Sequence, residues 1–342
     1  MVKAVVVSKF GNPASAELTA ELKVVDVDMP HAGPGEVVIK MLAMPVNPAD
    51  IFSINGVYPG FQPASLPAMP GLEGVGKVVE VGPGVTGITV GQRVVPFFLY
   101  SDRHVASGHG SWQEYVSFPA TEVFIVPDYI STEEAAQIVV NPTTAYTMLD
   151  EINPPKGSYV LQTAAGSVLA RQFIQFAKAR GVRSINIVRR AELVEELKAI
   201  GADEVFLESE DWVSKVKAVT GGAGAYGAID PVAGRMVAML TSAVRPNGQV
   251  IIYGAMNGLE FSGSVLDVLF RGVVVKGFWV TAWTNEHGVE PMRKVVESIW
   301  PLLKQKTVVP FIGKKYKLAE VADAVKESIK AARGGKVMLV TE

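Results

Sequence analysis

Residues Ser158 to Ala170, SYVLQTAAGSVLA, are the most informative part of the sequence for the fold. Its first five residues suit a buried strand, and the residues after the glycine continue in a helical pattern to Lys178. A strand that leads through a glycine turn into a helix brings free N–H groups toward a phosphate. The segment is read either as a dinucleotide-binding turn or as an ordinary strand–helix turn.

The glycine pattern of this turn is reduced. We expect Gly166 to make the tight turn and Ala170 to allow close packing of the helix. Val168 stands where a glycine would let the backbone approach a phosphate most closely. The motif alone is therefore weak.

Alternation of strand and helix continues downstream of this turn. The helical pattern after the second strand carries Leu193, Val194, Leu197 and Ile200 on one face, and Gly201 is placed to end it. Right-handed crossovers between such units give a doubly wound, six-stranded parallel sheet of the Rossmann type. The expected strands are Ser158–Gln162, Ser184–Val188, Glu204–Leu207, Gly227–Asp230, Gln249–Tyr253 and Val273–Phe278.

Two arginines, Arg189 and Arg190, follow the second of these strands. An NAD-binding sheet places Asp or Glu at this point for the ribose 2′-hydroxyl, and a carboxylate there would repel a 2′-phosphate. A guanidinium can hold that phosphate bidentately and stack on adenine. The pair favours NADPH over NADH; the other reading is two solvated surface arginines at the start of a helix.

Two further GxGxxG patterns lie outside the required context. Gly82, Gly84 and Gly87 link two expected strands. The second pattern, from Gly222 to Gly227, comes before a strand instead of after one. We expect neither pattern to bind the pyrophosphate.

The rest of the chain indicates a second, β-rich domain. Short strands such as Glu36–Lys40, Gly76–Val81 and Arg93–Pro96 are separated by Pro/Gly turns. An amphipathic helix over Leu318–Ala332 and a strand over Lys336–Val340 are expected to return to this domain. The expected division is 1–128 for the β-rich domain, 129–307 for the Rossmann domain and 308–342 for the return to the first.

Composition excludes several classes of protein. The chain has 342 residues, of which 49% are hydrophobic and 19% charged, with a formal net charge of -2. Such a chain forms large cores, and it has no basic surplus for nucleic-acid binding. It has no cysteine, so disulfides, thiolate metal ligands and thiol nucleophiles are excluded. No apolar run approaches the ~20 residues of a membrane span, and no targeting segment is recognised, so a cytoplasmic location without membrane attachment is expected.

Several motifs together resemble one known group of proteins. Gly71-Leu72-Glu73-Gly74, Asn47-Pro48-Ala49-Asp50, the turn at Gly166 and Gly335-Lys336-Val337 resemble the medium-chain dehydrogenase/reductase superfamily over nearly the whole chain. That resemblance implies a GroES-like β-rich catalytic domain beside the Rossmann domain. Leu72 stands where the zinc branch carries a histidine, and the cysteine ligands of that branch are missing. No metal is therefore expected.

Within the zinc-free members, the chain is most similar to the mitochondrial-type trans-2-enoyl thioester reductases. The stretches that carry this likeness are 47–60 (NPADIFSINGVYPG), 140–149 (VNPTTAYTML), 253–256 (YGAM) and 277–283 (GFWVTAW). The NPxD motif with a following tyrosine also occurs in quinone oxidoreductases, which are the second resemblance. The longer segment from Leu99 to Gly110 is expected to reshape the substrate entrance, and the mitochondrial transit peptide of the family is not recognised in this chain.

The resemblance implies a set of functional residues. Tyr58 falls on the catalytic proton donor of the family, and Asn47 is implied as a polar contact near the nicotinamide or the substrate. The implied contacts of NADPH are Asn141, Gly166, Ser167, Val168, Leu169, Arg189, Arg190, Ala191, Tyr253, Gly254, Ala255, Met256, Phe278, Trp279, Val280, Thr281 and Lys336.

Each assignment has a plainer alternative. Tyr58 is also read as a partly buried aromatic in a Pro/Gly loop, and Asn47 as a turn former before proline. Trp279 and Trp283 line an acyl pocket or belong to the core. His104 and His109 share one loop, but two histidines without a supporting cysteine make a poor metal site.

Three hypotheses for the function follow. The first is an NADPH-dependent reductase of 2-enoyl thioesters, in which a hydroxyl such as that of Tyr58 stabilises the enolate without a metal. The second is an NADPH:quinone or enone oxidoreductase, and the third is an NADPH-binding protein without catalysis. The expected partner is a small-molecule substrate, an enoyl thioester or enone, and superfamily members of this type commonly form homodimers.

Overall fold

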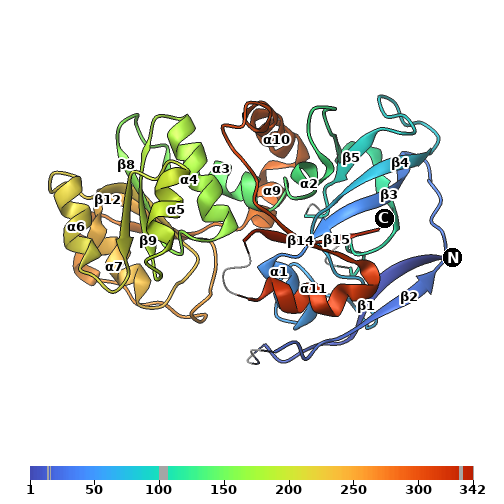
Figure 1. Ribbon diagram of the computed structural model, residues 1–342, viewed down its shortest axis with the longest axis horizontal. Coiled ribbons are helices and arrows are strands. Elements are labelled where there is room, and N and C mark those ends of the chain that lie inside the picture. The colour runs from blue at the N-terminus through green and yellow to red at the C-terminus, as the bar shows by residue number, and fades with distance from the viewer. Residues whose placement is uncertain (14, 16, 100–106, 331–333, 342) are drawn as a thin grey trace. The chain divides into compact units, whose positions relative to one another are not determined.

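A computed structural model describes residues 1–342 except 14, 16, 100–106, 331–333 and 342 (Figure 1). The chain forms two compact units, each treated separately below. Unit 1 comprises Met1–Val140, Trp283–Lys304 and Pro310–Glu342, and unit 2 comprises Asn141–Ala282 and Gln305–Val309.

Unit 2 contains a six-stranded sheet in the order β10-β9-β8-β11-β12-β13. Every neighbouring pair is parallel, which confirms the doubly wound sheet that the sequence predicts. The order reverses between β8 and β11, and the carboxyl ends at such a reversal are where these sheets bind ligands. The strands are β8 (Tyr159–Gln162), β9 (Arg183–Val188), β10 (Glu204–Leu207), β11 (Ala225–Asp230), β12 (Val244–Ile252) and β13 (Val274–Gly277).

Helices cover both faces of this sheet. One core joins Ile185 and Ile187 of β9 to Trp212 and to helix α7, and a separate core packs α4 and α5 against Val188. The helices are α3 (Asn141–Ile152), α4 (Val168–Ala179), α5 (Leu193–Ala199), α6 (Trp212–Val219), α7 (Met236–Ala243) and α8 (Val265–Arg271). Two apolar layers against one sheet are the arrangement that the alternating sequence predicts.

Local signals in unit 2 gave most but not all of the element bounds. Helix α5 ends before Gly201, whose φ of 106° is accessible mainly to glycine. Strand β12 begins at Val244, five residues before the expected start at Gln249. Its Pro246-Asn247-Gly248 segment reads as a turn, but Asn247 adopts a left-handed conformation with φ 57° and the strand continues through an irregular register.

Unit 1 is the β-rich unit. A seven-stranded sheet runs in the order β14-β15-β3-β4-β5-β7 with β6 also paired to β3, and β1 and β2 form a separate antiparallel pair. The strands are β1 (Val2–Lys9), β2 (Glu21–Val27), β3 (Glu36–Pro45), β4 (Val75–Val81), β5 (Arg93–Pro96), β6 (Tyr115–Pro119), β7 (Val123–Ile125), β14 (Ile312–Lys317) and β15 (Lys336–Val340). The helices are α1 (Pro48–Ile54), α2 (Thr132–Ala136), α10 (Val289–Lys304) and α11 (Val321–Ser328), while α9 (Val280–His287) spans residues of both units.

The C-terminal segment belongs to unit 1, where β15 pairs with β3. The helix expected over Leu318–Ala332 is shorter than predicted. Residues Leu318–Glu320 form a separate 3₁₀ turn, in which the Glu320 carboxylate accepts the Lys317 N–H at 2.8 Å. Helix α11 then ends at Ser328, whose hydroxyl donates to the Val325 carbonyl and competes with the helical ladder. Residues 331–333 lie outside the described part of the chain.

The two GxGxxG patterns outside the turn after β8 lie between the elements that the sequence predicts for them. Gly82–Gly87 joins β4 to β5, and Gly222–Gly227 leads from α6 into β11. Within the described residues, no helix is both long enough and apolar enough to cross a bilayer.

Candidate functional site

The cofactor residues expected in unit 2 gather at the carboxyl edge of its sheet. Gly166–Leu169 follow β8, Arg189–Ala191 follow β9, Tyr253–Met256 follow β12, and Phe278–Thr281 follow β13. Asn141 is the first residue of α3. Because all six strands are parallel, these loops share one edge of the sheet, where the Rossmann architecture binds nucleotides.

The turn after β8 is built differently from the expectation. The residue with positive φ is Ala164, at 46°, whereas Gly166 is not in the left-handed region. Gly166 is required for space, since a Cβ there would lie 2.7 Å from Leu193 Cδ1. Ser167 then caps α4, with its hydroxyl accepting the Ala170 N–H at 3.3 Å. The first N–H groups of α4 stay available for an anion.

The two arginines lie immediately after β9 and before α5, as the sequence predicts. Arg190 Nη1 pairs with Glu192 Oε1 at 3.1 Å, and both side chains are partly exposed. Arg189 is exposed, and within the described residues no carboxylate pairs with it. Arg189 is therefore the more available of the two for an external phosphate.

Two buried hydroxyls at this edge are incompletely bonded. Tyr253 Oη and Thr281 Oγ1 are both buried without a well-formed hydrogen bond, although Ser167 lies close to the tyrosine. Burial raises the pKa of the Tyr253 hydroxyl, and it stays a protonated donor. Buried polar groups normally have partners. A bound dinucleotide offers the acceptors that these hydroxyls lack, so the residues present fit a nicotinamide cofactor.

Sequence reasoning missed a polar contact at the reversal point of the sheet. The Thr163 hydroxyl, after β8, donates a short hydrogen bond to Asp230 Oδ1 at the end of β11, and Ala233 N–H donates to Asp230 Oδ2 at 2.7 Å. Burial raises the pKa of the Asp230 carboxyl, while the Thr163 hydroxyl opposes that rise. The contact ties the two central strands together at the edge where the expected cofactor residues gather.

In unit 1, three sequence motifs meet in one buried polar cluster. Asn47 Nδ2 donates to Glu73 Oε1 at 3.0 Å, and Lys336 Nζ donates to Asn47 Oδ1 at 2.5 Å. Glu73 Oε2 accepts the Val140 N–H at 2.9 Å, and Asp50 Oδ2 accepts the Asn47 N–H at 2.7 Å. Asn47, Asp50, Glu73 and Lys336 are each at most 1% exposed. The cluster fixes the orientation of the Asn47 amide, because only one orientation satisfies both neighbours.

Glycines let the segments that carry Glu73 and Lys336 pass close to their neighbours. A Cβ on Gly71, whose φ is 112°, would lie 2.4 Å from Ser111 Oγ, and a Cβ on Gly335 would lie 2.5 Å from the Ile312 carbonyl carbon. The motifs around Glu73 and Lys336 therefore contain glycine because their backbones pass close to neighbouring segments. Sequence reasoning singled out Asn47 and Lys336 but missed Asp50 and Glu73, although both lie inside the quoted motifs.

The two carboxyl groups of the cluster share one buried cation. Burial raises the pKa of the Asp50 carboxyl to about 7, and the nearby Glu73 charge adds to that rise. Burial also raises the pKa of Glu73, while Lys336 opposes the change. Asp50 Oδ1 is buried without a hydrogen-bond partner. The cluster therefore holds a titratable proton on Asp50 near neutral pH.

This proton gives a prediction on stability. An acid whose folded pKa lies above its unfolded value binds more protons when folded, so stability falls as pH rises from about 4 through about 7. The gap between 3.8 and about 7 limits the loss to about 4 kcal/mol. Asp50→Asn is expected to flatten this part of the stability curve, measured by urea unfolding from pH 5 upward to about 8. The exposed control Asp28→Asn should leave it unchanged, and an unaltered curve in Asp50→Asn would contradict the prediction.

Tyr58 lies in the loop that follows α1, the helix that Asn47 caps. Its side chain is partly buried, and its carbonyl accepts the Phe61 N–H and the Gln62 side-chain amide, both at 3.0 Å. These bonds form a turn directly after Tyr58. The phenolic hydroxyl of a tyrosine can serve as a hydrogen-bond donor or as a proton source.

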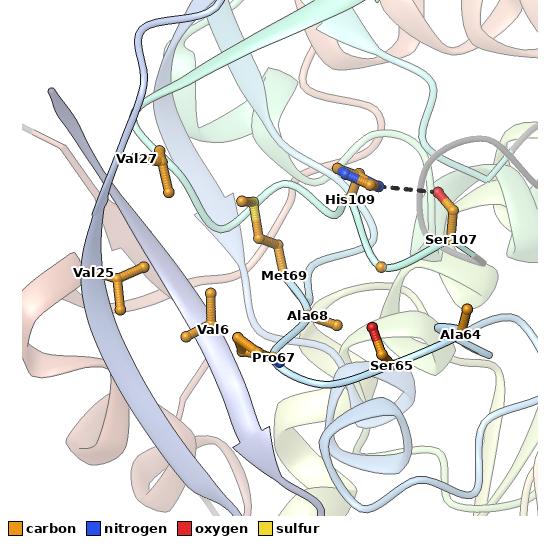
Figure 2. A pocket seen from close by; sticks show the side chains of 11 residues that line it. Val6, Val25, Val27, Ala64, Ser65, Pro67, Ala68, Met69, Ser107 and His109 are labelled. Carbon is orange, nitrogen blue, oxygen red and sulfur yellow. Dashed lines mark hydrogen bonds between the residues drawn. The ribbon is translucent and has the colours of Figure 1, made fainter.

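Unit 1 also contains a shallow apolar cavity of about 320 Å3, which none of the predicted site residues lines (Figure 2). Val6, Val25 and Val27 lie on one side, and the segments 64–69 and 107–109 on the other. His109 Nδ1 lies 3.2 Å from Ser107 Oγ. His104 and part of the Leu99–Gly110 segment lie outside the described residues. Within the described part of the chain, no cluster of three or more His, Cys, Asp or Glu is arranged to hold a metal.

Comparison with known proteins places the chain. The family described as alcohol dehydrogenase GroES-like domain matches residues 33–128, and the family described as zinc-binding dehydrogenase matches 172–298. A mitochondrial enoyl-acyl-carrier-protein reductase of Arabidopsis thaliana is 35% identical over 322 residues, which are 90% of this chain and 82% of that protein.

Two solved structures are similar over the full length. A mycobacterial quinone oxidoreductase is 28% identical with a TM-score of 0.83, covering 99% of this chain and 100% of that one. A mycobacterial protein in complex with NADPH is 27% identical, with the same TM-score and coverage.

Fold and site together define an oxidoreductase of the medium-chain dehydrogenase/reductase superfamily that uses a nicotinamide cofactor. Within that superfamily, the chain belongs to the family of the enoyl-acyl-carrier-protein reductases.

Proposed function

We propose that the protein reduces the C=C bond of 2-enoyl thioesters, carried by CoA or by acyl carrier protein, with NADPH as the reductant. The observation that carries this proposal is the 35% identity, over nine-tenths of the chain, to a protein named as an enoyl reductase. Arg189 and Arg190 support NADPH over NADH, because their charges suit a 2′-phosphate. The NADPH complex of a similar protein supports the same choice.

The residues of unit 2 would bind and orient the cofactor. Arg189 would hold the 2′-phosphate, and the N–H groups at the start of α4 would hold the pyrophosphate. The protonated hydroxyls of Tyr253 and Thr281 would donate hydrogen bonds to the bound dinucleotide. When bound, NADPH supplies a hydride to the β-carbon of the substrate.

Residues of unit 1 would stabilise the negative charge that develops on the substrate and would supply a proton to it. Reduction at the β-carbon develops negative charge on the thioester oxygen, and the resulting enolate needs a donor and then a proton at the α-carbon. We assign both tasks to the Tyr58 hydroxyl. We also propose Asn47 as a polar contact near the nicotinamide or the substrate, through an amide whose orientation Glu73 and Lys336 fix.

A parallel assay tests the substrate class. NADPH oxidation is measured with crotonyl-CoA, with a longer enoyl-CoA and with a quinone at matched concentrations. The proposal requires the highest kcat/KM with an enoyl thioester. The likeness to the mycobacterial quinone oxidoreductase supports the alternative, an NADPH:quinone or enone oxidoreductase. Turnover of the quinone without turnover of either thioester would overturn the first choice in favour of the second.

We also propose that the protein is a homodimer that pairs through unit 2. Nine of the 21 exposed large apolar side chains among the described residues lie between 256 and 274, including Leu266 and Phe270 of α8 at 66% and 75% exposure. The adjacent strand β13 is an edge of the sheet, bonded only to β12 in the described structure. Apolar patches and open strand edges are typical association surfaces, and a two-fold axis would pair one edge with its copy.

The dimer proposal predicts the effect of one charge. Phe270→Glu is expected to shift the protein from dimer to monomer in light scattering, because each two-fold contact would bury the new charge on both copies. Phe52→Glu, at an exposed apolar residue of unit 1, is the matched control and should leave the mass unchanged. A monomeric wild type, or a dimer that survives Phe270→Glu, would contradict the proposal.

A further inference from the structure

Four side chains form a row at the opposite, amino-terminal edge of the unit 2 sheet. Strand β8 pairs Tyr159 with Arg183 of β9, and the pairing of Val160 with Gly227 puts Tyr226 of β11 beside Tyr159. Arg245 stands near the start of the next strand, β12. The order across four neighbouring strands is therefore Arg183, Tyr159, Tyr226, Arg245. We call these four residues the Arg–Tyr row.

Each arginine of the row stacks on a tyrosine. Arg183 Cζ lies 4.0 Å from the centroid of the Tyr159 ring, and Arg245 Cζ lies 3.9 Å from that of Tyr226. The four residues line one cavity of about 260 Å3, which Thr220 and Gly224 help to close. The stacks hold the two guanidinium groups against the cavity wall, so that little side-chain entropy remains to be lost on binding.

The row carries positive charge without a compensating acid. Among the described residues, no carboxylate forms an ion pair with Arg183 or Arg245. Arg245 Nε is buried without a hydrogen-bond partner. Arg183 donates to the Gly157 carbonyl from Nε and Nη2, at 2.9 and 2.7 Å, and to Tyr159 Oη from Nη1 at 3.1 Å. A partly buried guanidinium such as that of Arg245, with no anionic partner among the described residues, is costly, and an anion bound in the cavity beside it would lower that cost.

The remaining hydrogen-bonding groups of the row are donors. Tyr159 Oη accepts from Arg183, so its own hydrogen is free to donate. Tyr226 has no hydrogen bond from its hydroxyl within the described structure, and the guanidinium of Arg245 has only donors. Two arginines and two phenolic hydroxyls in one cavity match the acceptor oxygens of a phosphate group.

Gly224 belongs to the second GxGxxG pattern, which does not have the context of a dinucleotide motif, and it shapes one side of this cavity. Gly224 has a φ of 86°, and a Cβ on it would lie 2.8 Å from the backbone nitrogen of Arg245 and 2.7 Å from the carbonyl carbon of Val244. Only glycine lets the turn before β11 pass so close to the start of β12. The turn therefore closes one side of the cavity beside Arg245.

We propose that the Arg–Tyr row is a second anion site, which binds a small phosphorylated molecule separately from the nicotinamide cofactor. The cofactor residues follow the carboxyl ends of the same strands. Tyr159 and Thr163 are four residues apart on β8 and its end, which corresponds to about 13 Å along a strand. The cavity volume of about 260 Å3 lies below the usual range for drug-sized ligands and suits a small phosphorylated molecule.

Calorimetric titration with inorganic pyrophosphate tests the proposal. The protein is first saturated with NADPH, so that the dinucleotide site is filled, and ionic strength is held constant with sodium chloride. We expect one pyrophosphate to bind per chain. Arg245→Gln and Arg183→Gln should each weaken that binding about tenfold or more, because each removes a charge-assisted contact. The exposed Arg235→Ala, also in unit 2, should bind as the wild type does.

Tyr226→Phe tests the same site even if the arginine variants fail to fold. It keeps the ring and the Arg245 stack, removes only the hydroxyl, and should weaken pyrophosphate binding several-fold with an unchanged Tm. Absence of binding to the NADPH-saturated wild type would overturn the proposal. Equal affinity in the wild type, Arg245→Gln and Tyr226→Phe would overturn it as well. These outcomes are independent of turnover, so they leave the proposed reductase function untouched.

Discussion

Tyr58→Phe is expected to lower kcat for an enoyl thioester by about 10²- to 10⁴-fold, the range for losing a positioned acid or base. The ring and its packing stay, while the donor that would meet the developing enolate is lost. Because the hydroxyl is not assigned to the cofactor, NADPH affinity should not change. Stopped-flow measurement of hydride transfer, together with fluorescence titration of NADPH, separates the two effects.

Tyr129→Phe is the matched control for this substitution. Tyr129 is 47% exposed, and phenylalanine would keep the contact of its ring with Lys304. Its kcat should equal that of the wild type. Wild-type turnover in Tyr58→Phe would remove Tyr58 from the mechanism, whereas equal losses in kcat and NADPH affinity would point to a structural role.

The second large effect concerns the choice of cofactor. Arg189→Ala is expected to weaken NADPH binding by about 10- to 150-fold, since one charge-assisted contact to the 2′-phosphate contributes about 1.5–3 kcal/mol. NADH lacks that phosphate, so its affinity should stay constant. Arg190→Ala should have a smaller effect, because Arg190 already pairs with Glu192. The measurement is the ratio of dissociation constants for the two cofactors.

Arg235→Ala, at an exposed arginine of unit 2, controls for a general loss of positive charge. Its NADPH/NADH ratio should match that of the wild type. A parallel fall in NADPH and NADH affinity in Arg189→Ala would mean that this arginine acts on a part shared by both cofactors. The assignment to the 2′-phosphate would then be wrong.

The Rossmann sheet could be predicted from sequence because its signals are local. Buried parallel strands read as short apolar runs, and α5 shows its helical face and its terminating Gly201 directly. The two GxGxxG patterns could be set aside because neither follows a strand and opens a helix, as a dinucleotide-binding turn does. The structure confirms that the first joins two strands and that the second leads into a strand. Local information failed at β12, where Pro246-Asn247-Gly248 has turn composition but continues a strand.

The buried polar groups could not be predicted because their partners are distant in sequence. Asn47 meets Lys336 across 289 positions, and Thr163 meets Asp230 across 67. Neither pairing leaves a spacing that periodicity could detect. The positive φ of Ala164 could not be predicted either. Comparison with the short glycine motif assigns the tight turn to Gly166, whereas the left-handed residue of the turn is Ala164. Motif resemblance did identify the segments that contain Asp50 and Glu73, but not their contacts.

The identity of the product and the position of its label decide whether the protein is an enoyl thioester reductase. The protein is incubated with crotonyl-CoA and NADPH that carries deuterium at both C4 positions, and the thioester is analysed by mass spectrometry and proton NMR. We expect butyryl-CoA with one deuterium, located at the β-carbon, formed in step with NADPH oxidation. Recovery of unreacted crotonyl-CoA, or deuterium at the α-carbon, would contradict this expectation.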